Sequence, residues 1–187
     1  MLPMSLRDVR ELLDDPSRTW GERRARLQGW RGLDAARADA AVFAQRVGPA
    51  VCAVGAFVGA SLQSPLLLAI VAVTAVVGTT APNHPMEAVY NRWADRRGRP
   101  TLPVNRAAKR LGCAIGAVLL GGAAVAYAVG AETVGLVLAL VLGGTATFVA
   151  LTGICVPSLL FTTVWGVERA CEVRLRAPRS VAPEPTR

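Results

Sequence analysis

Residues 47–86 read VGPAVCAVGAFVGASLQSPLLLAIVAVTAVVGTTAPNHPM and contain no Asp, Glu, Lys or Arg. A hydrocarbon core about 30 Å thick is crossed by roughly 20 helical residues, so this stretch is long enough for two membrane spans. The segment Gln63-Ser64-Pro65 divides it, because its serine can cap a new helix and its proline suits the first helical position. We therefore predict spans at Pro49–Leu62 and Pro65–Thr80, the first entered by a longer helix from Ala35.

Two further stretches lack charged residues, Leu111–Ala131 and Thr133–Val167. The first predicts one span, within a helix over Arg106–Val129. The second predicts a span over Thr133–Gly153, followed beyond Pro157 by a kinked extension or by a helix that lies in the interface. The expected fold is an all-α integral membrane four-helix bundle with amphipathic cytoplasmic helices, and five spans is the alternative.

The composition agrees with a membrane protein. The chain has 187 residues, of which 52% are hydrophobic and only 18% charged, and its net charge is +8. Soluble domains carry about a quarter charged residues. So many apolar residues in uninterrupted runs exclude intrinsic disorder and argue against a water-soluble enzyme or a nucleic-acid-binding protein.

The basic residues lie in three places. All 21 Lys and Arg residues fall before the first span, in the loop 81–110 or after the last span. By the positive-inside rule, both termini and this loop are expected in the cytoplasm, so that the charge needs no nucleic acid to explain it. We divide the chain into a cytoplasmic arm at 1–33 without a cleavable signal peptide, a membrane domain at 34–176 and a disordered tail at 177–187.

Small residues are expected to pack the spans, because lipid gives apolar side chains no reason to prefer one another. Gly55 and Gly59 form one Gly-x-x-x-Gly pair, and Gly112 and Gly116 form another. Such pairs serve either packing within the chain or a seam between two copies.

The loop 81–110 contains an amphipathic pattern. Met86, Val89, Tyr90 and Trp93 follow the spacing i, i+3, i+4, i+7, which predicts a short helix with one apolar stripe. With His84 or Asn83 as its cap, this helix would lie on the membrane or on the inner end of the bundle.

The N-terminal arm carries similar patterns. One stripe is formed by Leu6, Val9, Leu12 and Leu13, and a second by Trp20, Leu27 and Trp30 among several arginines. Tryptophan with arginine is typical of interfacial helices held by anionic lipid headgroups. The alternative is that these helices dock on the protein itself or on a partner.

Three segments are similar to a known family. They are FAQR at 43–46, NHPMEAVYN at 83–91 and TGICVPS at 152–158. They resemble the bacterial integral membrane proteins classed as domain of unknown function 4395, over about residues 38–166. The resemblance implies a multi-pass protein of the bacterial cytoplasmic (inner) membrane, and it supplies no activity. Some members have Cys-x-x-Cys where this chain has Cys155-Val156-Pro157-Ser158, without the second cysteine.

Cys155 and His84 are the candidates for chemistry. Both are expected near the cytoplasmic ends of their helices, and a thiol beside an imidazole could act as a nucleophile or sulfur carrier. The structural interpretation is that Cys155 packs at a kink and His84 caps the helix from Pro85. Cys52 and Cys113 are expected to behave as small hydrophobic residues, and Cys171 as a reduced cytoplasmic thiol. No cofactor motif and no metal-ligand set is recognisable.

The spans also lack ionisable groups other than thiols and Tyr127, which argues against a pump. The leading hypothesis is therefore an accessory or scaffold protein, with no predicted enzymatic activity, that binds a protein partner or a second copy at its basic cytoplasmic face. The alternative is a thiol-based redox or sulfur-handling protein that uses Cys155 with His84.

Overall fold

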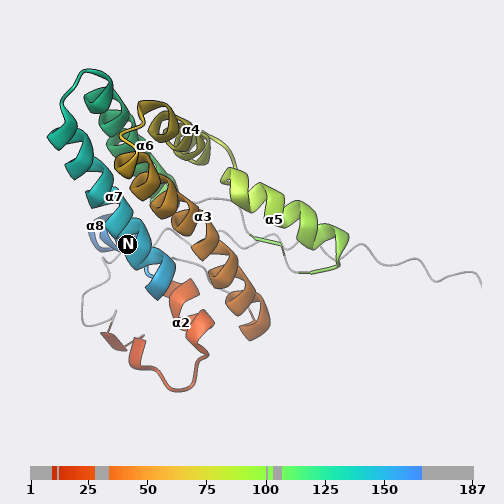
Figure 1. Cartoon of the computed structure of the whole chain (residues 1–187). Coiled ribbons are helices and arrows are strands. Elements are labelled where there is room, and N and C mark those ends of the chain that lie inside the picture. The colour runs from red at the N-terminus through yellow and green to blue at the C-terminus, as the bar shows by residue number, and fades with distance from the viewer. Residues whose placement is uncertain (1–9, 12, 28–33, 100, 103–106, 166–187) are drawn as a thin grey trace, which may run out of the picture.

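The computed structural model describes residues 10–11, 13–27, 34–99, 101–102 and 107–165. All regular secondary structure in these ranges is helical, which confirms the all-α class (Figure 1). The helices are α2 (Trp20–Leu27), α3 (Ala35–Ser61), α4 (Pro65–Thr80), α5 (Pro85–Arg96), α6 (Ala107–Ala128), α7 (Glu132–Thr152) and α8 (Val156–Trp165).

Three helices are long and apolar enough to cross a membrane: α3, α6 and α7. With 21 to 27 residues each, they extend over roughly 30 to 40 Å. Helix α4 has only 16 residues. It is long and apolar enough for a span only together with α5, from which a bend of 67° separates it. The chain thus has three to four candidate spans.

The boundaries of α4 follow the predicted chemistry. The side chain of Ser64 accepts a hydrogen bond from the backbone N–H of Leu67 at 3.3 Å, and Pro65 occupies the first helical turn. Gln63 adopts a left-handed conformation with φ of +48°, which reverses the chain between α3 and α4. Its side chain donates to Glu132 at 3.3 Å, so that this connection lies beside the α6–α7 connection. We call this the far end of the molecule.

The long helices pack against one another around small side chains. Helix α3 contacts α7 and α4, while α6 contacts α4 and α7 (Figure 1). The core between them is built largely from alanines with a few larger side chains: Ala56, Ala60, Leu68, Val71, Ala72, Leu120, Ala123, Ala124, Tyr127 and Ala139. Many larger apolar side chains lie on the outer surface instead, as is appropriate where the surrounding solvent is lipid.

The two Gly-x-x-x-Gly pairs differ in how closely they are packed. A Cβ on Gly59 would lie 2.7 Å from Leu68, and a Cβ on Gly55 would lie equally close to Val71. Both glycines therefore face α4 of the same chain. At Gly112 and Gly116 the nearest side-chain atoms would be 3.5 and 3.7 Å away, which is ordinary contact.

At the opposite end, which we call the basic end, α2 and α5 pack around the first half of α3. The backbone of Asp39 lies directly against Gly21 of α2. A second apolar cluster joins α2, α3, the loop after α5 and α5 itself through Ala25, Ala38, Ala41, Val42, Leu102 and Tyr90. Asn91 fixes that loop, because its amide both donates to and accepts from the backbone of Leu102, at 3.2 and 2.6 Å.

A break separates α7 from α8. Gly153 ends α7 in a left-handed conformation with φ of +68°, and α8 begins three residues later. The ten described residues of α8 extend over only about 15 Å, which is less than the thickness of a hydrocarbon core. Helix α8 contacts α6.

Several predicted features lie outside the described residues. They are most of the first N-terminal stripe (Leu6, Val9 and Leu12), Trp30, Cys171 and the tail at 177–187.

Close packing at Gly59 gives a testable prediction. We expect Gly59→Ala to lower the thermal unfolding midpoint by several degrees, because Leu68 is fully buried and overpacking costs about 1–3 kcal/mol. Gly121→Ala is the matched control, since nothing lies within 4 Å of its added methyl group, and it should be neutral or slightly stabilising. Equal effects of both changes on unfolding in detergent would contradict the packing.

Candidate functional site

The site begins at the start of α5, where His84 and Glu87 form a capping box. The imidazole Nδ1 of His84 accepts a hydrogen bond from the N–H of Met86 at 3.4 Å, and the Glu87 carboxylate accepts one from the N–H of His84 at 3.1 Å. Reciprocal bonds of this kind satisfy backbone donors that a helix start leaves free. The predicted capping role of His84 is thus present.

The second oxygen of Glu87 pairs with Lys109 in the first turn of α6. Both side chains are withdrawn from solvent, since 4% of Glu87 and 18% of Lys109 is exposed. A buried charge is tolerated only when it is paired, and removing one partner costs about 3–5 kcal/mol. The pair therefore ties α5 to α6.

His84 fits into a space that Gly78 provides. Its ring lies against Gly78 of α4 and faces Gly48 of α3. Its Cδ2 and the sulfur of Cys113 are 2.7 and 2.9 Å from the position of a Cβ on Gly78, so these two atoms are at most about 5.6 Å apart. Burial, and secondarily the charge of Lys109, lowers the pKa of His84 to about 4. The imidazole is therefore neutral at pH 7.

Cys155 reaches the same region from the α7–α8 connection. It directly precedes α8, and its carbonyl accepts the first helical hydrogen bond, from Leu159, at 2.9 Å. Its half-buried sulfur would be 3.8 Å from a Cβ on Gly112. Lys109, one turn earlier on α6, interacts electrostatically with Cys155 and with Cys113.

Five side chains thus gather at the basic end from four parts of the chain. We call them the thiol–lysine cluster: His84, Glu87, Lys109, Cys113 and Cys155. The sequence predicted His84 and Cys155 as candidates for chemistry and Cys113 as a packing residue, but it did not predict the ion pair. It shows an acidic residue at the third position of α5 and a lysine in the first turn of α6, without any local pattern to indicate that the two meet.

The remaining predicted interfacial residues have different surroundings. Leu27 is 3% exposed and therefore packs inside the protein, whereas Trp20 and Trp93 are each 40% exposed. Tyr90 packs against the second apolar cluster, and its ring lies 5.7 Å from that of Trp93. Docking on the protein thus accounts for Leu27 and Tyr90.

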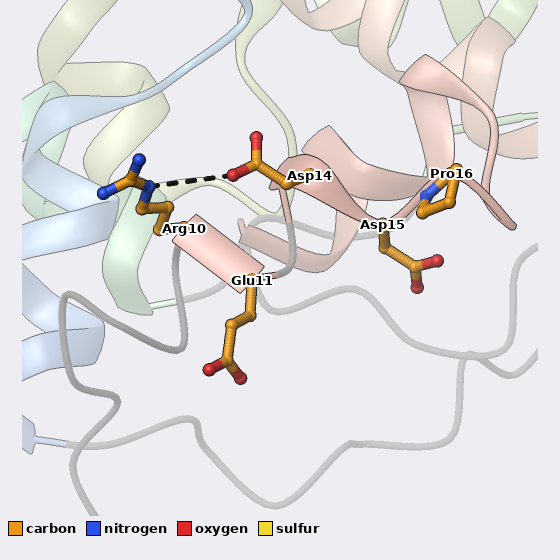
Figure 2. Close-up of a pocket in the computed structure, with 5 residues that line it drawn as sticks. All are labelled: Arg10, Glu11, Asp14, Asp15 and Pro16. Carbon is orange, nitrogen blue, oxygen red and sulfur yellow. Dashed lines mark ion pairs between the residues drawn. The ribbon is translucent and has the colours of Figure 1, made fainter.

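The described residues contain no group of three or more His, Cys, Asp or Glu side chains placed to hold a metal ion. An open pocket in the N-terminal arm is lined by Arg10, Glu11, Asp14, Asp15 and Pro16 (Figure 2). Arg10 and Asp14 pair across it at 3.8 Å, and both are highly exposed, so this pair contributes little.

Comparison with known proteins places the chain in a family. The model of the family described as domain of unknown function 4395 matches residues 42–165. The chain belongs to this family. The matched region contains α4 to α8, most of α3 and the whole thiol–lysine cluster, whereas α2 precedes it. No curated protein and no solved structure matches the chain.

The buried ion pair can be tested by a double-mutant cycle. Glu87→Gln leaves the ammonium of Lys109 without its carboxylate, so we expect the free energy of unfolding in detergent to fall by about 3 kcal/mol. Adding Lys109→Met removes the unpaired charge and should recover much of this loss. If the effects of the two substitutions simply add, the pair does not exist in solution.

Proposed function

We propose that this protein is a thiol-active protein of the bacterial inner membrane, with Cys155 as its reacting group. The observation that carries this proposal is the position of Cys155 directly before α8 and against Gly112 of α6, one turn from Lys109. Lys109, rather than His84 alone, then serves as the basic neighbour of this thiol.

The proposed topology has four spans, with α4 as the fourth, and both termini in the cytoplasm. It is supported by the distribution of the Lys and Arg residues. Those in the described ranges lie at the basic end or in its helices α2 and α5, as the positive-inside rule expects of a cytoplasmic side. The thiol–lysine cluster then faces the cytoplasm, where small thiols are abundant and where disulfides occur as transient catalytic or redox-sensing species.

The reaction class is thiol–disulfide exchange. The Cys155 thiolate attacks one sulfur of a disulfide substrate, so that a new S–S bond joins that sulfur to Cys155 while the substrate's own S–S bond breaks. The departing thiolate takes up a proton from the solvent. A thiol from the cytoplasm then releases the bound half in a second exchange of the same kind, which regenerates Cys155.

Alkylation of a single-cysteine protein tests this proposal. With Cys52, Cys113 and Cys171 replaced by Ala or Ser, we expect Cys155 to react with iodoacetamide at pH 7 faster in Glu87→Gln than in the parent protein. Removing Glu87 leaves the positive charge of Lys109 uncompensated, and a nearby cation speeds the attack of a cysteine sulfur on an alkylating reagent. Adding Lys109→Met should slow the reaction about tenfold relative to Glu87→Gln.

The matched control retains Cys52 as the only cysteine and carries the same two substitutions. Cys52 lies in the middle of α3, and its labelling should not respond to them. Equal alkylation rates of Cys155 in all three proteins would contradict a role for Lys109 and overturn the proposal.

A second candidate function is the binding of an acidic protein partner by α5. The exposed ring of Trp93 lies 5.8 Å from the guanidinium of Arg97 and 5.2 Å from that of Arg99, and Arg92 and Arg96 are exposed nearby. Tryptophan and arginine are the residues most often found at binding hot spots. An accessory or scaffold role would use this surface.

This second candidate predicts a stoichiometric partner. Affinity purification of the full chain in a mild detergent should recover it, and the substitutions Trp93→Ala, Arg97→Gln and Arg99→Gln should abolish its recovery, because they remove the exposed ring and two of its cations. Recovery that is unchanged by these substitutions, or the absence of any partner, would rule out α5 as a docking surface.

A further inference from the structure

Arg24 of α2 differs from the other arginines at the basic end. Two of its guanidinium nitrogens, Nε and Nη1, are buried and have no hydrogen-bond partner among the described residues. Arginine remains charged at every pH that proteins meet, so these donors cannot be neutralised by losing a proton. Burying unpaired donors of a charged group costs free energy that a folded protein normally recovers through an acceptor.

Two cations share one aromatic ring at this place. The guanidinium of Arg24 lies over the ring of Trp20 at 5.6 Å, and that of Arg46 lies over the same ring at 5.7 Å. The face of the ring attracts each cation, whereas the two guanidinium groups repel each other. The neighbouring Arg23 adds a like charge, and burial followed by this charge lowers the pKa of Arg24. The acidic residue of α2, Glu22, already accepts a hydrogen bond from the N–H of Thr19 at 2.8 Å.

Arg46 shows where Trp20 and Arg24 lie along the molecule. It donates to the carbonyls of Ala150 and Leu151, the latter at 3.0 Å, in the last turn of α7. It thereby neutralises the negative pole of that helix. Trp20 packs next to Gly153, the residue that ends α7. Arg24 and Arg46 therefore lie where α7 ends and where the uncharged part of α3 begins.

We propose that Arg24 and Arg46 bind a phosphate group at the junction of α2, α3 and α7. A phosphate oxygen would accept from the two buried donors of Arg24, which pair with phosphate oxygens more strongly than with neutral acceptors. Arg46 retains donors beyond the two that it uses on α7. The phosphate can belong to an anionic lipid headgroup or come from solution.

The test uses the full chain in lipid nanodiscs. Its thermal unfolding midpoint is measured in phosphatidylcholine alone, in phosphatidylcholine with phosphatidylglycerol, and in phosphatidylcholine with inorganic phosphate in the buffer. We expect phosphatidylglycerol, inorganic phosphate or both to raise the midpoint by at least about 3 °C. Phosphatidylglycerol acting alone identifies a lipid headgroup as the source.

The paired variants are Arg24→Gln and Arg26→Gln, which remove the same charge from the same helix. Arg26 is exposed, so its loss should leave the response intact, whereas Arg24→Gln should abolish it. In dodecyl maltoside micelles, which contain no phosphate group, Arg24→Gln should be at least as stable as the parent, because it removes unpaired buried donors. Equal responses of the two variants, no response of any protein, or a loss of stability specific to Arg24→Gln without anion would each overturn the site.

Discussion

The buried ion pair between Glu87 and Lys109 holds the basic end together. Glu87 also caps α5 through the backbone of His84, so one carboxylate fixes the start of α5 and its attachment to α6. A charged pair this deeply withdrawn needs its geometry maintained, since either partner alone is costly. Because Lys109 is held there, its charge is also held beside Cys113 and Cys155.

The long helices obey a different constraint, which comes from lipid. Apolar side chains gain nothing by leaving hydrocarbon, so contact between helices depends on close approach of their backbones. Alanine and glycine line the interior, and Gly55 and Gly59 leave room for larger side chains of α4. At the site, Gly78 makes room for the ring of His84 in the same way. Small residues thus provide both helix packing and space for polar groups at the basic end.

The sequence predicted the helices well because their signals are local. Uninterrupted apolar stretches, the cap at Ser64 and the capping role of His84 each depend on neighbouring residues, and the structure places them as expected. The ion pair depends on residues 22 positions apart on two helices, and nothing in their spacing indicates that they meet. The burial of Leu27 could not be predicted from the sequence either, because an arginine-rich amphipathic helix can face lipid or protein with the same pattern.

Bridging of Cys113 and Cys155 by a short bifunctional thiol reagent tests the central claim most directly. In the full chain with Cys52→Ala and Cys171→Ser, both remaining thiols lie beside Lys109, and Cys155 packs on the residue preceding Cys113. The structure predicts that mass spectrometry will find the two cysteines linked within one chain. If each thiol accepts a monofunctional reagent but no bridge forms, the thiol–lysine cluster does not exist as described.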